Sequence, residues 1–186
     1  MVATSTSPIS GTGGTQAGVS GETPTIRHVD VQRVSVTSRR PFGEVMATID
    51  AAIGHPDAAV LRQIGTAPTY AEVERIVGSA VGPSGLLEFL RFDIGEVLRK
   101  ANCPGAPKSL RLIVGNSTIM KQLVEHVPDA ASYTPPTILV DERWDCVQLS
   151  YDRLASFLDP YGSATALEVA RSVDVRIEAL LVSAAT

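Results

Sequence analysis

The chain has 186 residues, and its 16 Lys and Arg against 20 Asp and Glu give a formal net charge of −4. Apolar residues make up 44% and charged residues 19%, which is typical of a folded globular protein and not of a disordered one. Basic residues stand singly, so the electrostatic footprint of a nucleic-acid-binding protein is missing, and no apolar run approaches the ~18 residues of a membrane span. We therefore expect a soluble protein with no nucleic-acid partner and no membrane-embedded part.

Residues 1–25 differ in composition from the rest of the chain. Seventeen of them are Gly, Ser, Thr or Pro, and Glu22 is the single charged residue. So little apolar surface cannot offset the entropy of ordering, so we predict a flexible tail in front of one domain at 26–186. The segment has no secretory n-region or h-region and no Arg of a mitochondrial transit peptide, which favours a cytoplasmic location.

After the tail, apolar periodicity predicts both strands and helices. Pro41 opens a helix whose apolar stripe recurs at helical spacing, from Phe42 to Ile53. Strands are expected at 28–37, 85–93, 110–114, 137–141 and 147–151, the last two as a β-hairpin. Helices are expected at 41–53, 70–81, 94–101, 117–127 and 163–183, with 55–68 a connector or weak helix. This order predicts an α+β domain: an antiparallel sheet with helices packed on one face and a long C-terminal helix.

Four short phrases in register resemble a known family. They are Phe92-Asp93, Val114-Gly115-Asn116 followed by Met120, Thr134-Pro135-Pro136, and the segment 145–152 with the sequence DCVQLSYD. In order and spacing they are similar to the family catalogued as domain of unknown function 302, across roughly residues 31–181. The resemblance implies a compact β-α-β4-α domain, related in architecture to the TATA-binding-protein and helix-grip folds and often a homodimer.

The chain departs from the pattern of that family at three positions. Ile94 stands where members commonly have His, Ser117 where they have Pro, and Cys146 where their hairpin has Gly. A role built on the missing His therefore does not carry over. Cys146 is predicted to be a strained turn residue and not a nucleophile, because no histidine lies near it in sequence.

The sequence predicts no cofactor and no metal site. Cys103-Pro104 resembles the Cys-Pro pairs that ligate haem in some proteins, but a Pro-rich loop with one thiol favours an ordinary loop. The three histidines are dispersed and lack the acidic spacing of a zinc site.

Charged residues interrupt the apolar strand expected at 85–93. Alternation places Glu88 on one face, and Arg91 and Asp93 on the other. Either one of these charges lies at a pocket, where burial would perturb its pKa, or Arg91 and Asp93 form a weak ion pair on a solvated face. Since Asp93 can pair with Arg91, Glu88 is left without a local partner and is the better candidate for binding a ligand.

Two further candidates flank the helix expected at 117–127. Asn116 precedes its first turn, where free N–H groups could bind a carboxylate or phosphate, or where the Asn side chain caps the helix. His126 lies at the boundary between the apolar face and solvent, where it could exchange a proton with a ligand or interact with the last helix carbonyls. For both residues we favour the structural role.

Tyr133, Tyr151 and Asp152 form another polar group around the predicted hairpin. Buried phenols at such positions usually bond a backbone carbonyl. Alternatively, the three side chains lie at the mouth of a cavity between the sheet and the long helix, where they would hold the polar end of an apolar ligand.

Two classes of function follow from these residues. The first is a small domain that binds a small organic or anionic ligand between sheet and helix, with or without cofactor-independent turnover. The alternative is a structural or interaction module whose sheet forms a dimer interface and binds no ligand. No nucleophile–base pair or cofactor motif decides whether the protein is an enzyme. A pocket of several hundred Å³ containing Glu88, Arg91 or Tyr151 would favour binding.

Overall fold

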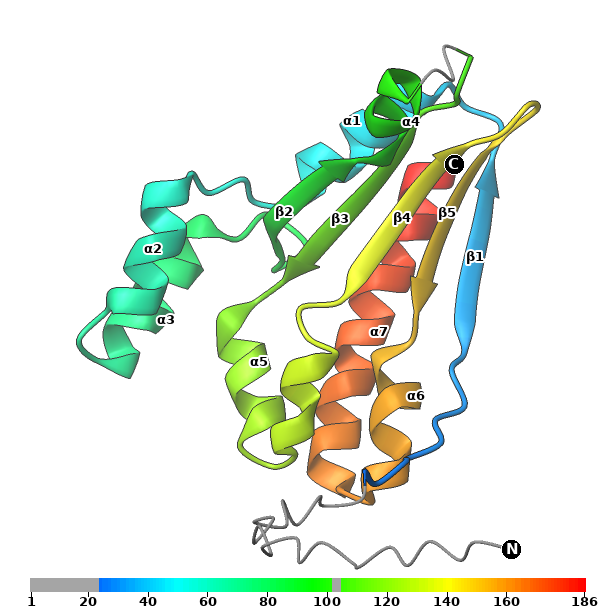
Figure 1. Ribbon diagram of the computed structural model, residues 1–186. Coiled ribbons are helices and arrows are strands. Elements are labelled where there is room, and N and C mark those ends of the chain that lie inside the picture. Colours follow the sequence, from blue (N-terminus) through cyan, green and yellow to red (C-terminus); the bar gives the residue numbers. More distant parts are fainter. Residues whose placement is uncertain (1–23, 102–104) are drawn as a thin grey trace, which may run out of the picture.

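One five-stranded antiparallel sheet organises the computed structural model, which describes residues 24–101 and 105–186 (Figure 1). Its order is β1-β5-β4-β3-β2. The strands are β1 (Arg33–Ser38), β2 (Leu87–Asp93), β3 (Ser109–Gly115), β4 (Thr137–Glu142) and β5 (Val147–Asp152). The predicted α+β class and the β4–β5 hairpin are confirmed. The predicted tail lies outside the described residues, apart from Pro24 and Thr25.

Seven α-helices complete the described part of the chain. They are α1 (Phe42–Ala52), α2 (Ala58–Thr66), α3 (Tyr70–Ala80), α4 (Ile94–Lys100), α5 (Ser117–Val124), α6 (Leu154–Leu158) and α7 (Ala164–Ala185). Side chains that accept N–H groups of the first turn fix where most of them begin; Asp57, Thr69, Asn116 and Ser163 do so for α2, α3, α5 and α7. None of these helices combines the length and apolar character that crossing a bilayer requires.

Three elements differ from the sequence-based expectation. Residues 58–66 form a capped helix, which settles the choice between connector and weak helix. The first strand begins at Arg33, because residues 24–32 run past α6 and do not pair along the sheet. The short helix α6 was not predicted; it follows β5 directly and packs on α7.

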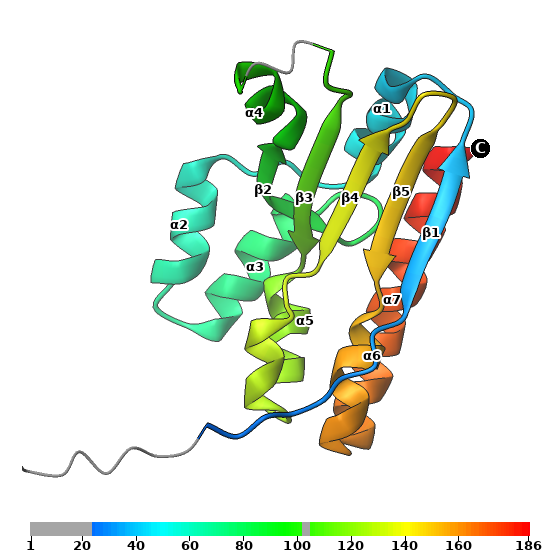
Figure 2. The same ribbon diagram turned by 45° about the vertical axis from the view of Figure 1, so that its right-hand side comes forward.

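One face of the sheet is covered by α7 and α1, with α5 and α6 beside them (Figure 1). The inward side chains of the central strands meet α7 in one apolar core, and each fully buried aliphatic residue contributes about 1.5–3 kcal/mol. Core residues from the strands are Leu112, Val114, Ile138, Val140 and Leu149, and those from α7 include Ile177 and Leu181. The opposite face carries no helix across its centre (Figure 2).

The helices α2 and α3 lie beyond the β2 edge of the sheet and are tied to it at one crossing (Figure 2). The N–H groups of Gly54 and Gly82 both donate to the carbonyl oxygen of Leu86, at 2.9 Å each, and Glu88 N–H donates to the Gly54 oxygen at 2.8 Å. A Cβ at Gly54 would stand 1.8 Å from the Ala80 carbonyl oxygen, so the close approach requires glycine. The crossing fixes residue 55 beside strand β2.

Candidate functional site

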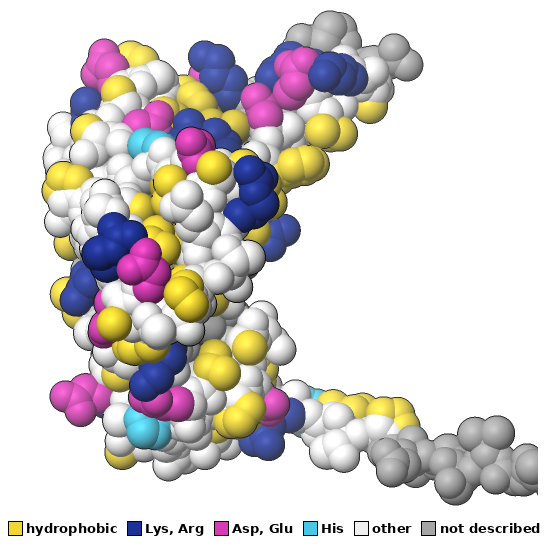
Figure 3. All heavy atoms as spheres, turned by 90° about the vertical axis from the view of Figure 1, so that its left-hand side faces the viewer, with side chains coloured by type: hydrophobic (Ala, Val, Ile, Leu, Met, Phe, Trp, Pro, Cys, Tyr) yellow, Lys and Arg dark blue, Asp and Glu magenta, His cyan; other side chains and the backbone are white. Residues whose placement is uncertain are grey.

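The open face of the sheet is concave. In register across the five strands, it presents a row of side chains: Phe92, Arg111, Leu139, Ser150 and Ser35. A hollow of about 700 Å³ lies over this face. Figure 3 shows it in profile on the right-hand side, where the surface curves inward below the projecting end that carries α4. The volume is in the range of small-molecule sites.

Two arginines enter this hollow. Arg33 of β1 binds Asp152 of β5 through two hydrogen bonds, from Nε at 2.7 Å and from Nη2 at 2.8 Å. These bonds raise the pKa of Arg33. Arg111 of β3 is exposed, and within the described residues it forms no ion pair. It stands between Phe92 and Leu139 in register, so a guanidinium that pairs with no carboxylate of residues 24–101 and 105–186 lies among apolar side chains.

An aromatic group forms the lower wall of the hollow. The ring of Tyr133 stacks on Phe157 with centroids 4.8 Å apart, and its hydroxyl lies 3.1 Å from that of Tyr161. That hydrogen bond is the main reason that the pKa of Tyr161 rises to about 12. The Tyr161 phenol is therefore neutral at physiological pH, and Tyr133 presents a polar edge beside an apolar ring face.

Tyr151 borders the hollow, but its side chain points the other way, into the core. Its hydroxyl donates to Asp174 Oδ1 at 2.6 Å and accepts from Leu154 N–H at 3.1 Å. Asp174 also accepts from the N–H groups of Leu154 and Ala155, so it caps α6 from the side of α7. Burial raises the pKa of Tyr151 well above its ordinary value. The structural reading of a bonded, buried phenol holds, with a carboxylate as the partner in place of a carbonyl.

The space between sheet and α7, where the sequence analysis placed a ligand, is filled by the core. The remaining gap between α5, α7 and the sheet measures about 10 Å³, which is too small for an organic molecule. Of the predicted binding residues, the structure brings Tyr133, Asp152 and the backbone side of Tyr151 together, on the outer face of the sheet.

Glu88 and Arg91 lie in a second polar cluster. The prediction that their side chains lie on opposite faces of the sheet is wrong. The register of β2 shifts between Glu88 and Leu90, so a β-bulge at Phe89 turns both charges to the same face. Arg91 Nη2 donates to Glu88 Oε2 at 2.6 Å and to Asp50 Oδ1 of α1 at 2.5 Å. Burial opposes the charge of Arg91, but its two carboxylate partners outweigh it and raise its pKa.

Glu88 therefore has a local partner, contrary to expectation. Its side chain is only 15% exposed, which agrees with the predicted partial burial. Asp93 does not pair with Arg91; it caps α4 by accepting from Glu96 N–H at 2.6 Å. Together with His55, Asp50 and Glu88 form the one group among the described residues whose donor atoms could hold a metal ion.

The other predicted residues stand apart from both clusters. Asn116 caps α5, accepting from Thr118 N–H at 2.9 Å, and donates to the Gly85 carbonyl oxygen at 3.0 Å, so its polar atoms are used within the fold. His126 is exposed after α5, with Glu125 at 3.9 Å. Cys146 lies in the hairpin loop, where loss of solvent around it raises the pKa of its thiol and disfavours a thiolate. Cys103 lies outside the described residues.

Sequence reasoning missed Arg111, Asp50 and His55. Arg111 had a usable signal, because it alternates with Leu110 and Leu112 and so must face away from the core. Asp50 and His55 had none, since Asp50 pairs with Arg91 and His55 with Glu88, each across more than thirty residues of sequence.

The fold and these clusters define an α+β domain with a one-sided sheet and two separate polar sites. The chain matches the family described as Domain of unknown function DUF302 over residues 66–184, and it belongs to that family. It is similar in fold to the crystal structure of an uncharacterized conserved protein DUF302 from Bacillus stearothermophilus. The TM-score is 0.57 at 12% identity, over 82% of this chain and 97% of the other. No curated protein matches the chain.

Proposed function

We propose that this protein binds a small amphipathic organic anion in the hollow on the open face of the sheet. The observation that carries the proposal is Arg111, a guanidinium that forms no ion pair with the described residues and stands between Phe92 and Leu139. A carboxylate would supply the missing counter-charge through charge-assisted hydrogen bonds, and its apolar part would cover the neighbouring side chains.

The walls of the hollow suit such a ligand. Ile94, Ile113 and Leu139 offer apolar surface, while Tyr133 offers a ring face and a hydroxyl. Within the described residues, its lining contains no histidine and no cysteine, the side chains that most often act as base or nucleophile near neutral pH. This lining supports binding over turnover. Free Cys146 is compatible with a reducing compartment, and we propose that binding takes place in the cytoplasm.

Isothermal titration calorimetry with defined probes tests the proposal. The probes are 3-phenylpropionate and octanoate, each compared with its uncharged primary amide. The wild type is expected to bind the acids and to bind the amides at least about tenfold more weakly, equivalent to about 1.4 kcal/mol. Arg111→Gln should remove that preference for the acids.

Arg62→Gln is the matched control, because Arg62 is an exposed arginine on α2, away from the hollow. It should bind both probes as the wild type does. Methyl NMR shifts at Ile113 and Leu139 would place the ligand. Equal acid binding by Arg111→Gln, or shifts confined to other residues, would contradict the proposal, as would a wild type that binds neither acid.

A second candidate function uses the same face as an interface between two copies of the chain. Exposed apolar residues favour it: Leu90 and Phe92 on β2 are 53% and 50% exposed, and Val97 on α4 is 50% exposed. Native mass spectrometry of the wild type and Phe92→Ser separates the two. A dimer that Phe92→Ser dissociates supports the interface, whereas a monomer that carries an anionic ligand supports the binding site.

A further inference from the structure

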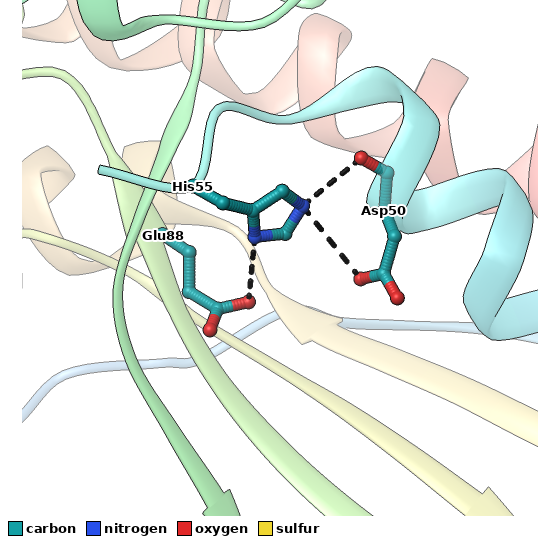
Figure 4. A group of neighbouring side chains, drawn as sticks. All are labelled: Asp50, His55 and Glu88. Atoms are coloured by element: carbon teal, nitrogen blue, oxygen red, sulfur yellow. Dashed lines mark hydrogen bonds and ion pairs between the residues drawn. The ribbon is translucent and has the colours of Figure 1, made fainter. Parts of the chain in front are cut away.

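Three side chains from separate segments converge beside the β2 edge (Figure 4). Asp50 comes from the last turns of α1, His55 follows that helix, and Glu88 lies on β2 at the bulge. The Gly54 crossing described above holds the backbone of residue 55 against β2. One donor atom from each side chain can be chosen so that all three lie within 4.8 Å of one another.

The orientation of the His55 ring is fixed by a backbone contact. Its Nε2 lies 3.0 Å from the Asp50 carbonyl oxygen, and a carbonyl oxygen can only accept, so Nε2 carries the proton. In the neutral ring, Nδ1 is then a bare lone pair, and it faces Glu88 Oε2 at 3.7 Å. Histidines that bind metal ions typically donate their other N–H to a carbonyl or carboxylate in this way. Two acceptors that face each other with no proton between them are suited to a shared cation.

The net charge of the cluster favours binding of a further cation. Asp50 and Glu88 share one guanidinium, that of Arg91, so with neutral His55 the four side chains carry a net negative charge. Arg91 Nη2 already sits between the two carboxylates as a cation does. Glu88 Oε2 accepts from both Nε and Nη2 of Arg91, at 3.1 and 2.6 Å, so a metal ion at this oxygen has to displace one of these bonds. Each Asp50 oxygen accepts a single bond from Arg91, and the cluster is open to solvent on the side of His55, whose side chain is 43% exposed.

We propose that Asp50, His55 and Glu88 bind a divalent transition-metal ion of the zinc type. Zinc–ligand bonds of about 2.0–2.2 Å put tetrahedral ligands roughly 3.3–3.6 Å apart, close to the Nδ1–Oε2 distance of 3.7 Å in the cluster. One imidazole and two carboxylates form a borderline donor set that favours Zn²⁺, Mn²⁺ or Co²⁺ over Ca²⁺. Asp50 Oδ1 lies 3.9 Å from His55 Nε2 and is bound by Arg91, so the Asp50 side chain has to turn towards Nδ1 to complete the site (Figure 4). The site lies on the helix-covered side of the sheet and is independent of the proposed anion hollow.

Zinc binding by tag-free protein tests the proposal, with calorimetry for affinity and Co²⁺ absorption for coordination. We expect one saturable site in the wild type. His55→Ala and Glu88→Gln should each weaken it at least about tenfold. His126→Ala is the matched control, because that exposed histidine also stands beside a carboxylate, Glu125, and its removal should leave the affinity within about twofold. Arg91→Gln should tighten binding, since it removes the competing cation.

The binding atom gives a readout that does not depend on variants. In ¹⁵N NMR of the histidine rings, Zn²⁺ should shift Nδ1 of His55 and leave Nε2 protonated. Metal at Nε2, wild-type affinity in His55→Ala, or no saturable binding would overturn the proposal. So would a His55 ring that only gains a proton towards Glu88 and never a metal. Circular dichroism of each variant separates a lost site from a lost fold.

Discussion

The two faces of the sheet are built from the same strands but meet different surroundings. In β4, Ile138 and Val140 point inward and are fully buried, whereas Leu139 between them lies on the open face. On β3, Leu112 is buried while Arg111 and Ile113 line the hollow. The helices thus secure the fold from one side alone, and apolar residues on the other side are not needed to hold the sheet together. That surplus apolar surface is what makes the open face a candidate for binding.

The largest difference between the faces should appear in matched leucine truncations. Leu149→Ala on the inner face leaves a cavity against the core and should lower the free energy of unfolding by about 2–5 kcal/mol. Leu139→Ala on the open face should cost less than about 1 kcal/mol. Urea unfolding of both variants measures the contrast. Equal losses would mean that the open face is covered in solution.

The hydrogen bond of Tyr151 on the inner face should also contribute more to the free energy of unfolding than that of Tyr133 in the hollow. Tyr151→Phe removes a buried hydroxyl that serves Asp174 and the Leu154 N–H, so we expect a loss of about 1–3 kcal/mol. Tyr133→Phe removes only a half-exposed contact with Tyr161 and should cost about 1 kcal/mol or less. Thermal and urea unfolding compare them. A larger effect of Tyr133→Phe would reverse the comparison.

A smaller effect depends on pH and comes from Asp174. Burial raises its pKa above the ordinary value of 3.8, despite the hydrogen bonds from Tyr151 and two backbone N–H groups. The native state therefore holds this proton to higher pH than the unfolded chain does. Its contribution is fully present below the unfolded pKa and is lost as the pH rises through the folded one. Relative to Asp174→Asn, the wild type should lose stability across that interval, measured by urea unfolding between about pH 3 and 7. Parallel pH profiles of the two proteins would contradict the prediction.

The smallest effect is expected at the rim of the hollow. Arg33 is 67% exposed, so its ion pair with Asp152 is screened by water, and Arg33→Gln should change the unfolding free energy by no more than about 0.5 kcal/mol. A change several times larger, lost on dilution of the protein, would show that a second copy covers this face.

Local sequence signals account for most of the fold. The helical stripe from Phe42 to Ile49 and the alternation in β4 and β5 each agree with the structure, because burial on one face imposes those periods directly. The helix α6 was not predicted, because five residues are too few to show a helical period and because its cap, Asp174, comes from α7.

The candidate sites were harder to predict, because each depends on a single local irregularity or on distant residues. Strict alternation set Glu88 and Arg91 on opposite faces, and one bulge residue reverses that conclusion. The strands β3 and β4 carry apolar residues on both sides, whereas helices cover only one face of the sheet (Figure 2). The sequence alone does not show which apolar residues remain exposed.

The Gly54–Gly82 crossing has a consequence for how this chain can be divided. The backbone leaves the sheet edge at Gly54 and comes back to the same spot at Gly82, and both N–H groups bind one carbonyl oxygen. The helices α2 and α3 thus belong to a segment whose two ends lie next to each other. Joining those ends by a short turn would reduce the entropic cost of closing the loop and leave the strand order intact. It would also remove the contacts that α3 makes with α5. By connectivity α2 and α3 are an insertion in the domain. The hollow does not depend on them, because the residues that line the hollow come from elsewhere in the chain.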